Sequence, residues 1–186
     1  MPSAKPVPIY QLKVTLHRTK PPIWRRVQVP ATITLARLHH VIQIAMGWHG
    51  GHLHEFVIAD RTYGPMGEYA TAEMDESRAR LNRVVTEPNT KIRYDYDFGD
   101  SWRHDIVLEK IVDPQPGQQY PICLTGKRAC PPEDVGGVWG YANFVAVMAD
   151  PTSEGHDDMA EWWGEDTFDP EAFNVEAINQ QLAGLR

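Results

Sequence analysis

The sequence predicts an α+β fold, in which a mainly antiparallel sheet is packed against an early helix and several C-terminal helices. Segments of alternating apolar and polar residues, typical of strands with one solvent-facing side, recur within residues 9–112. Helical spacing of apolar residues is confined to one early segment and to the end of the chain. Because strands cluster early and helices late, α+β is favoured over a doubly wound α/β arrangement.

A pair of neighbouring strands, or a β-hairpin, is expected first. Residues 9–17 alternate, and residues 23–29 alternate again after the Pro21-Pro22 punctuation. The next element is a helix over residues 34–47, where apolar residues follow the i, i+3, i+4, i+7 spacing. Thr34 is a suitable N-cap, and Gly47 suits a left-handed C-terminal residue.

The middle of the chain predicts further strands. A strand is expected from His52 to Ile58, followed by a short strand at 61–63 and a short helix or surface loop over 73–83. Residues 91–98 and 102–112 alternate, and Phe98-Gly99-Asp100-Ser101 between them supplies turn residues, so these two segments predict a hairpin.

Proline and glycine dominate residues 113–140, which are predicted to form a long structured loop, and loops of this length are often functional. Short helices are expected over residues 141–149 and 153–163. A last helix begins after an N-cap at Asn174.

Composition limits the class of protein. The 186 residues, 42% hydrophobic and 23% charged, suffice for one core, so residues 1–186 are expected to form a single domain with residues 1–8 flexible. No apolar run approaches the ~20 residues of a membrane span, and the first residues contain no apolar segment of the kind a signal peptide has, so secretion is not expected. A cytoplasmic protein without a membrane partner is expected. Cys123 and Cys130 are too few for a disulfide framework, and free, bridged or metal-bound states remain open.

Charge is strongly polarised along the chain. The net charge of −7 disfavours a dedicated nucleic-acid binder, but residues 1–54 carry +7 and residues 129–185 carry −12. Either the acidic third packs near the basic third and their fields partly cancel, or the basic region contacts a polyanion. The candidate polyanion contacts are Arg18, Lys20, Arg25, Arg26 and Arg37.

Two histidines in His52-Leu53-His54 have the spacing of metal ligands on a strand. Residues i and i+2 of a strand face the same side, so both imidazoles can reach one ion. The alternative is a pair of hydrogen-bonded polar residues at the start of a strand.

The predicted hairpin carries Asp97 and Asp100 at its turn and His104 on its return strand. Carboxylates and an imidazole in this arrangement suit a divalent cation or acid–base chemistry. Alternatively, the two aspartates cap the turn through their own backbone.

Residues 131–137 place Glu133 and Asp134 between a rigid Pro-Pro entry and a flexible Gly-Gly exit. This loop suits a cation clamp, or it docks on the arginines of the hairpin. We expect the three stretches to share one polar cleft lined by His52, His54, Asp97, Asp100, His104, Glu133 and Asp134. The cofactor that such a cleft would suit is a divalent metal, with His52, His54, Asp97, Asp100 and His104 as candidate ligands.

Several motifs occur in a characteristic order. They are Pro22–Arg26 (PIWRR), Ile42–Trp48 (IQIAMGW), His52–Phe56 (HLHEF), Tyr94–Trp102 (YDYDFGDSW) with His104, Cys130–Asp134 (CPPED) and Gly136–Tyr141 (GGVWGY). Together they resemble the plasmid pRiA4b ORF-3-like family from about Tyr10 to Leu182. The resemblance implies a single α+β domain and, through the transposon- or resolvase-type descriptions of some members, association with mobile elements. A serine resolvase needs an activated serine and a basic recognition helix, whereas the late helices of this chain are acidic.

Three functions are consistent with these patterns. The favoured one is a ligand- or partner-binding module without catalysis of its own, acting on an unknown protein or small molecule. The second is a metal-dependent hydrolase or nuclease using the candidate ligands above, with Glu133 or Asp134 as base. The third is a mobile-element-associated nucleic-acid accessory protein. The first is favoured because no single motif meets the geometry that the other two demand.

Overall fold

The fold is seen in a computed structural model that describes residues 6–68 and 70–185. Its strands are β1 (Ile9–Leu16), β2 (Trp24–Pro30), β3 (His54–Ile58), β4 (Arg61–Gly64), β5 (Met74–Asp75), β6 (Lys91–Tyr96), β7 (Trp102–Val112) and β8 (Ile122–Lys127). Its helices are α1 (Leu35–Met46), α2 (Leu81–Val84), α3 (Gly137–Met148), α4 (His156–Trp163) and α5 (Val175–Ala183). Residues 1–5, which belong to the segment expected to be flexible, lie outside the described residues.

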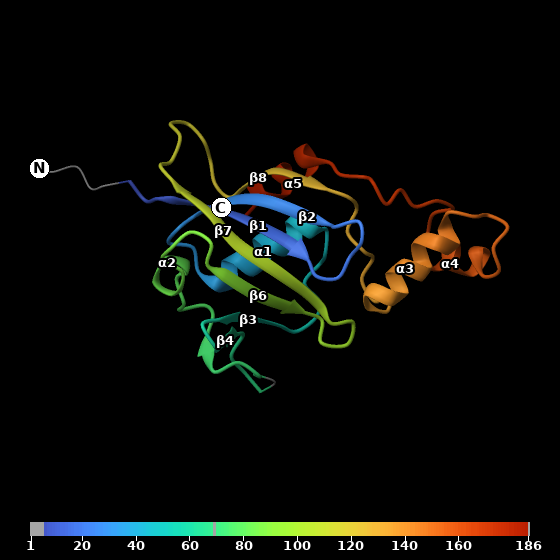
Figure 1. Ribbon diagram of the computed structural model, residues 1–186, viewed down its shortest axis with the longest axis horizontal. Coiled ribbons are helices and arrows are strands. Elements are labelled where there is room, and N and C mark those ends of the chain that lie inside the picture. Colours follow the sequence, from blue (N-terminus) through green and yellow to red (C-terminus); the bar gives the residue numbers. More distant parts are fainter. Residues whose placement is uncertain (1–5, 69, 186) are drawn as a thin grey trace, which may run out of the picture.

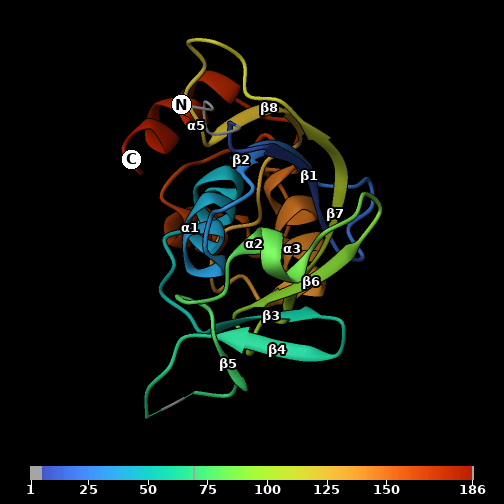
Figure 2. The ribbon, with the colours of Figure 1, turned by 90° about the vertical axis from the view of Figure 1, so that its left-hand side faces the viewer.

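Within the described ranges the strands form one sheet in the order β5-β4-β3-β6-β7-β1-β2-β8. Only β4 and β5 pair in parallel, and the other neighbours are antiparallel. The sheet curves around α1, which lies in its concave face (Figure 2). Helices α3 and α4 lie together at one end, beside the sheet (Figure 1). The predicted α+β fold with a mainly antiparallel sheet is confirmed.

Helix α1 forms where the sequence places it. The Thr34 side chain accepts a hydrogen bond from the Arg37 N–H, and Gly47 ends the helix with φ 102°. The apolar stripe of the helix is buried against the sheet, since Leu35, Leu38 and Val41 are all fully buried. Full burial of such side chains contributes about 1.5–3 kcal/mol each to the free energy of unfolding, so α1 anchors the concave face.

The hairpin of β1 and β2 and the hairpin of β6 and β7 both agree with the predictions. β1 pairs with β2 on one side and with β7 on the other, which joins the two hairpins into the centre of the sheet. Leu12, Val14 and Ile106 on this central part are at most 1% exposed. The turns of both hairpins, residues 17–23 and 97–101, therefore project from the same rigid strands.

Several elements differ from the predictions. Helix α4, predicted over residues 153–163, begins at His156, and β5 lies in the segment predicted as helix or loop over residues 73–83. β3 begins at His54 rather than His52. Residues 113–140, predicted as loop, contain β8, which pairs with the edge of β2. Helix α3 begins at Gly137, four residues before the predicted start. The sequence predicts a later start because Gly137 and Gly140, which lie in the first turn of the helix, are typical of loops. In the segment predicted as helix or loop, the described helix is the short α2.

Cys123 and Cys130 are both free thiols. Burial raises the pKa of both thiols, so they are not activated as nucleophiles. No helix within residues 6–68 and 70–185 has the length and apolarity needed to cross a membrane.

Candidate functional site

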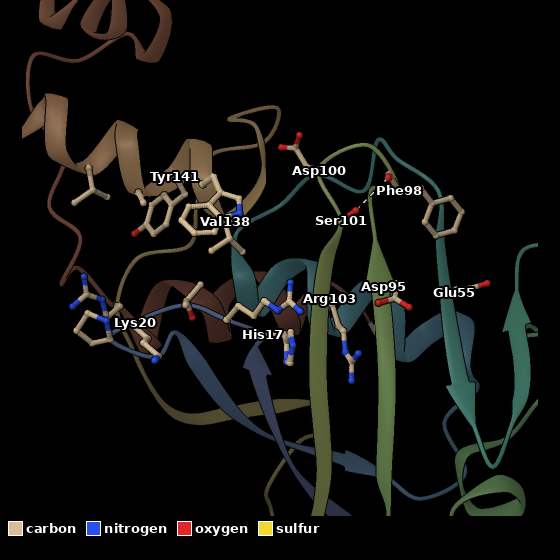
Figure 3. A pocket seen from close by; sticks show the side chains of 17 residues that line it. His17, Lys20, Glu55, Asp95, Phe98, Asp100, Ser101, Arg103, Val138 and Tyr141 are labelled. Carbon is tan, nitrogen blue, oxygen red and sulfur yellow. Dashed lines mark hydrogen bonds between the residues drawn. The ribbon is translucent and has the colours of Figure 1, made fainter. Parts of the chain in front are cut away.

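A cavity of about 1010 Å³ lies where three segments meet: the β1–β2 turn, the β6–β7 turn and the start of α3. Figure 3 shows Val138 and Tyr141 of α3 on one side, His17 and Lys20 on another, and the hairpin tip with Asp100 and Ser101 next to them. Small-molecule sites typically enclose about 300–1,000 Å³, so the volume suits one such ligand.

One wall of the cavity is cationic. Arg18 and Lys20 are exposed, and neither forms an ion pair with any described carboxylate. His17 lies beside them, and its Nδ1 is 2.7 Å from Asp105 Oδ2. Arg128 also lines this wall and pairs with Glu171 of the acidic C-terminal third. The two unpaired cations therefore give this wall an unneutralised positive charge.

The wall contributed by α3 is largely apolar. Val138, Trp139, Tyr141, Ala142 and Val145 line it. The Trp139 side chain is 88% exposed, although tryptophan is usually among the more buried residues. Phe98 at the hairpin tip is a second exposed aromatic lining residue. Exposed aromatic side chains around a concavity are typical of binding sites.

The carboxylates of the cavity already have partners. Asp95 and Glu55 both pair with Arg93, at 2.7 and 3.6 Å. Asp100 Oδ2 accepts a hydrogen bond from the Gly136 N–H at 3.0 Å. Their negative charge is therefore partly neutralised, whereas the charge of Arg18 and Lys20 is not.

Next to the cavity, His52, Asp97 and Asp134 form a compact cluster. His52 Nε2 lies 3.2 Å from Asp134 Oδ1 and 3.7 Å from Asp97 Oδ2. One ligand atom from each of the three residues lies within 4.8 Å of the others. The three residues come from the segment before β3, from the hairpin tip and from the loop before α3.

Hydrogen bonds hold the same three segments together. The Tyr96 O–H donates to Glu133 Oε1 at 2.5 Å, and the His49 N–H donates to the same oxygen at 3.2 Å. Burial and the Glu133 carboxylate raise the pKa of Tyr96. Five of the predicted cleft residues, His52, Asp97, Asp100, Glu133 and Asp134, therefore gather around this junction.

The other two predicted cleft residues, His54 and His104, lie in the core. His54 Nε2 is 2.9 Å from Glu76 Oε2, and its ring stacks on that of His39. His104 is fully buried, and its ring contacts Trp48 edge-on. The prediction that His52 and His54 reach one ion assumes a strand through both residues. Because β3 starts at His54, the two side chains turn to different surroundings.

The five predicted polyanion contacts do not form one surface. Arg18 and Lys20 line the cavity, but Arg25 is only 2% exposed and Arg26 pairs with Glu109 at 2.7 Å. Arg37 is exposed on α1, outside the cavity lining. Alternation along β2 explains the burial of Arg25, because its neighbours Ile23 and Val27 share the buried face.

Sequence reasoning missed several lining residues, chiefly His17, Arg103, Arg128 and the aromatic pair Phe98 and Trp139. A tryptophan is expected in the core by default, and Trp139 departs from that expectation.

The chain is similar to known proteins in sequence and in fold. Residues 8–177 match the plasmid pRiA4b ORF-3-like protein family, and the chain belongs to this family.

Two relatives can be named. The chain is 42% identical over 179 residues to uncharacterized protein y4hQ of Sinorhizobium fredii (strain NBRC 101917 / NGR234), covering 95% of this chain and 92% of that protein. It is also similar to the crystal structure of a protein of unknown function, MM3350 from Methanosarcina mazei Go1, with a TM-score of 0.84 and 39% identity. That match covers 92% of this chain and 98% of the other.

Proposed function

We propose that this protein is a binding module whose cavity accepts a small anionic molecule with an apolar, ring-containing body. The observation that carries the proposal is the composition of the cavity walls. Arg18 and Lys20 stand unpaired within the described residues on one wall, and the exposed Trp139 stands on another.

The cationic wall supports an anionic ligand. Two unpaired cations in one concavity repel each other, and an anion between them relieves that repulsion. Charge-assisted hydrogen bonds to arginine and lysine are roughly twice as strong as neutral ones. The neighbouring carboxylates Asp95 and Glu55 are engaged by Arg93 and so offset this attraction only partly.

The aromatic wall supports an apolar body in the same ligand. Burying apolar surface contributes about 25 cal/mol per Å², so covering an exposed indole favours binding. A ring stacked on Trp139 gains a further aromatic contact of about 0.5–1.5 kcal/mol. The net charge of −7 repels extended polyanions at long range, which favours a small ligand over a nucleic acid.

The test uses the fluorescent probe 8-anilinonaphthalene-1-sulfonate, which combines a sulfonate with aromatic rings. We expect one probe per chain, bound at the cavity. The double variant Arg18→Ala/Lys20→Ala and the single variant Trp139→Ala should each weaken binding about tenfold. Arg37→Ala removes an exposed cation away from the cavity and should leave binding unchanged.

The neutral analogue 1-anilinonaphthalene, which lacks the sulfonate, distinguishes a charged site from an apolar surface. It should bind wild type more weakly than the sulfonate, and the double variant should not change its affinity. The proposal fails if both probes bind equally well, or if the double variant binds the sulfonate as tightly as wild type.

A further inference from the structure

A second set of side chains, outside the cavity lining, has the arrangement of metal ligands. We propose that His52, Asp97 and Asp134 bind one divalent transition-metal ion, of the class that includes Zn²⁺ and Co²⁺. This proposal does not rest on the proposed function, because none of these three residues lines the cavity.

The distances between the ligand atoms fit a common ion. Metal–nitrogen and metal–oxygen bonds of about 2.0–2.2 Å place neighbouring ligand atoms about 3–3.5 Å apart and opposite ones about 4.2 Å apart. His52 Nε2 lies 3.2 Å from Asp134 Oδ1 and 3.7 Å from Asp97 Oδ2, and one ligand atom from each of the three residues lies within 4.8 Å of the others.

Asp97 points independently to a ligand at this position. Its side chain is only 10% exposed, and Oδ1 accepts hydrogen bonds from the Gly99 and Asp100 N–H groups. Oδ2 has no hydrogen-bond partner among the described residues and faces His52. A carboxylate in a largely buried side chain is stabilised by a partner at each oxygen, and a cation coordinated by Oδ2 would supply that partner.

The mixture of ligands selects the kind of ion. An imidazole nitrogen favours zinc and its neighbours in the first transition row over Mg²⁺ or Ca²⁺, which prefer all-oxygen sites. Three protein ligands also leave room for water, and the Asp134 side chain is 70% exposed, so solvent reaches the site.

Binding at this site would tie together three segments that are far apart in the chain. The ligands precede β3, follow β6 and precede α3, so one ion would link the hairpin tip to the loop that leads into α3. The bound ion would stabilise the folded chain, since the unfolded chain does not hold these ligands together.

The experiment titrates chelator-treated full-length protein with Zn²⁺ against a chromophoric competitor, and with Co²⁺ by visible absorption. We expect a 1:1 complex and a rise of the thermal midpoint with Zn²⁺. His52→Ala and Asp97→Asn should each weaken binding at least tenfold and abolish the thermal shift. Asp97→Asn keeps the Oδ1 acceptor of the turn. Because the Asp134 side chain is exposed, Asp134→Asn tests this third ligand without lowering the stability of the fold.

His49→Ala is the matched control, because it removes a nearby exposed imidazole that is not in the cluster. It should bind Zn²⁺ like wild type. Absence of a 1:1 complex in wild type, or wild-type affinity in His52→Ala or Asp97→Asn, would overturn the proposal. Binding of the anilinonaphthalene probe is measured without metal, so failure of metal binding leaves the cavity proposal standing, and the reverse also holds.

Discussion

The imidazole rings of His39 and His54 stack face to face, with centroids 3.6 Å apart and planes 8° from parallel. His54 Nε2 lies 2.9 Å from Glu76 Oε2, and His39 Nδ1 lies 2.7 Å from Tyr94 Oη. Tyr94 Oη also accepts a hydrogen bond from Gln43 Nε2 at 3.0 Å. Burial, followed by the neighbouring His54, lowers the pKa of His39 to about 3.

Glu76 fixes the end of this buried chain of polar groups. We expect Glu76→Ala to lower the free energy of unfolding by about 1–3 kcal/mol, because it leaves His54 Nε2 buried without its partner. Urea unfolding at pH 7.5 measures the change. Glu73→Ala, at an exposed position three residues earlier, is the control and should cost less than about 0.5 kcal/mol. Equal losses in the two variants would contradict a structural role for the His54–Glu76 contact.

Buried histidines should make the protein acid-sensitive. Burial lowers the pKa of His39 to about 3 and that of His104 to about 4. Both groups bind protons in the unfolded chain near their ordinary pKa of 6.5, whereas the folded chain binds them only at lower pH. The unfolded state therefore holds more protons below 6.5, and the free energy of unfolding should fall as the pH is lowered from 6.5 toward 4.

Each such histidine contributes a slope of up to about 1.4 kcal/mol per pH unit within this window. Denaturant unfolding at pH 7.5, 6.0 and 5.0 gives the slope. His104→Leu should flatten it, since it removes one of the two buried groups. An unchanged slope in this variant would show that His104 does not contribute to the pH dependence of the free energy of unfolding, contrary to the prediction. Carboxylates with lowered pKa, such as Glu109 beside Arg26, act mainly below their ordinary pKa of 4.5, which is lower than the three pH values measured.

The sequence predicts the elements whose signals are local. Alternation defines β1 and β2, and the spacing of apolar residues with Thr34 and Gly47 defines α1. The alternation of apolar and polar residues does not reveal β8, because this short segment is stabilised as a strand by its pairing with the edge of β2. Nor does it reveal the start of α3, because Gly137 and Gly140 are poor helix formers, and contacts with residues 100 and 135 position them there.

The candidate site is predictable in part. The sequence places His52, Asp97, Asp100, Glu133 and Asp134 in one group, and the structure gathers them. It also places His54 and His104 in that group. His54 lies in the core because β3 begins at His54 rather than at His52, and His104 lies in the core because it shares the buried face of β7 with Trp102 and Ile106. The cationic wall is harder to predict, because basic residues in similar sequence contexts have different surroundings. Arg18 lies on the surface, whereas Arg25 lies in the core.

Gly137 is expected to tolerate no side chain. Its φ is +69°, and an added Cβ would lie 2.6 Å from the Asp100 carbonyl oxygen, where the hairpin tip meets α3. Gly137→Ala should cost more than about 2 kcal/mol by combining a left-handed backbone with this collision, and it should weaken probe binding by moving the α3 wall. Urea unfolding and the probe titration measure the two effects.

Gly155→Ala separates the two causes. Gly155 also has positive φ, +84°, but a Cβ there meets nothing within 4 Å. It should cost only about 1 kcal/mol and leave probe binding intact. If Gly137→Ala were no more damaging than Gly155→Ala, the close approach of α3 to the hairpin tip would not be a constraint on the fold.

Arg25 should act as a structural residue rather than as a contact for polyanions. Its Nε donates to the Ala45 carbonyl at 2.7 Å, and its Nη1 donates to the carbonyls of Trp24 and Lys127 at 2.9 Å each. The guanidinium also lies over the Phe173 ring at 4.9 Å. These contacts join α1, the β2–β8 edge and the segment before α5.

A lysine at this position keeps the charge but cannot reproduce the planar fork, so Arg25→Lys should lower the free energy of unfolding by about 2 kcal/mol or more. Arg26→Lys is the matched comparison on the next residue. Arg26 lies on the more exposed face and pairs with Glu109, and such pairs contribute about 0–1 kcal/mol, so this variant should cost less than about 1 kcal/mol. Urea unfolding of both variants tests this role. If Arg25 were a polyanion contact rather than a structural residue, Arg25→Lys would lower the free energy of unfolding no more than Arg26→Lys does.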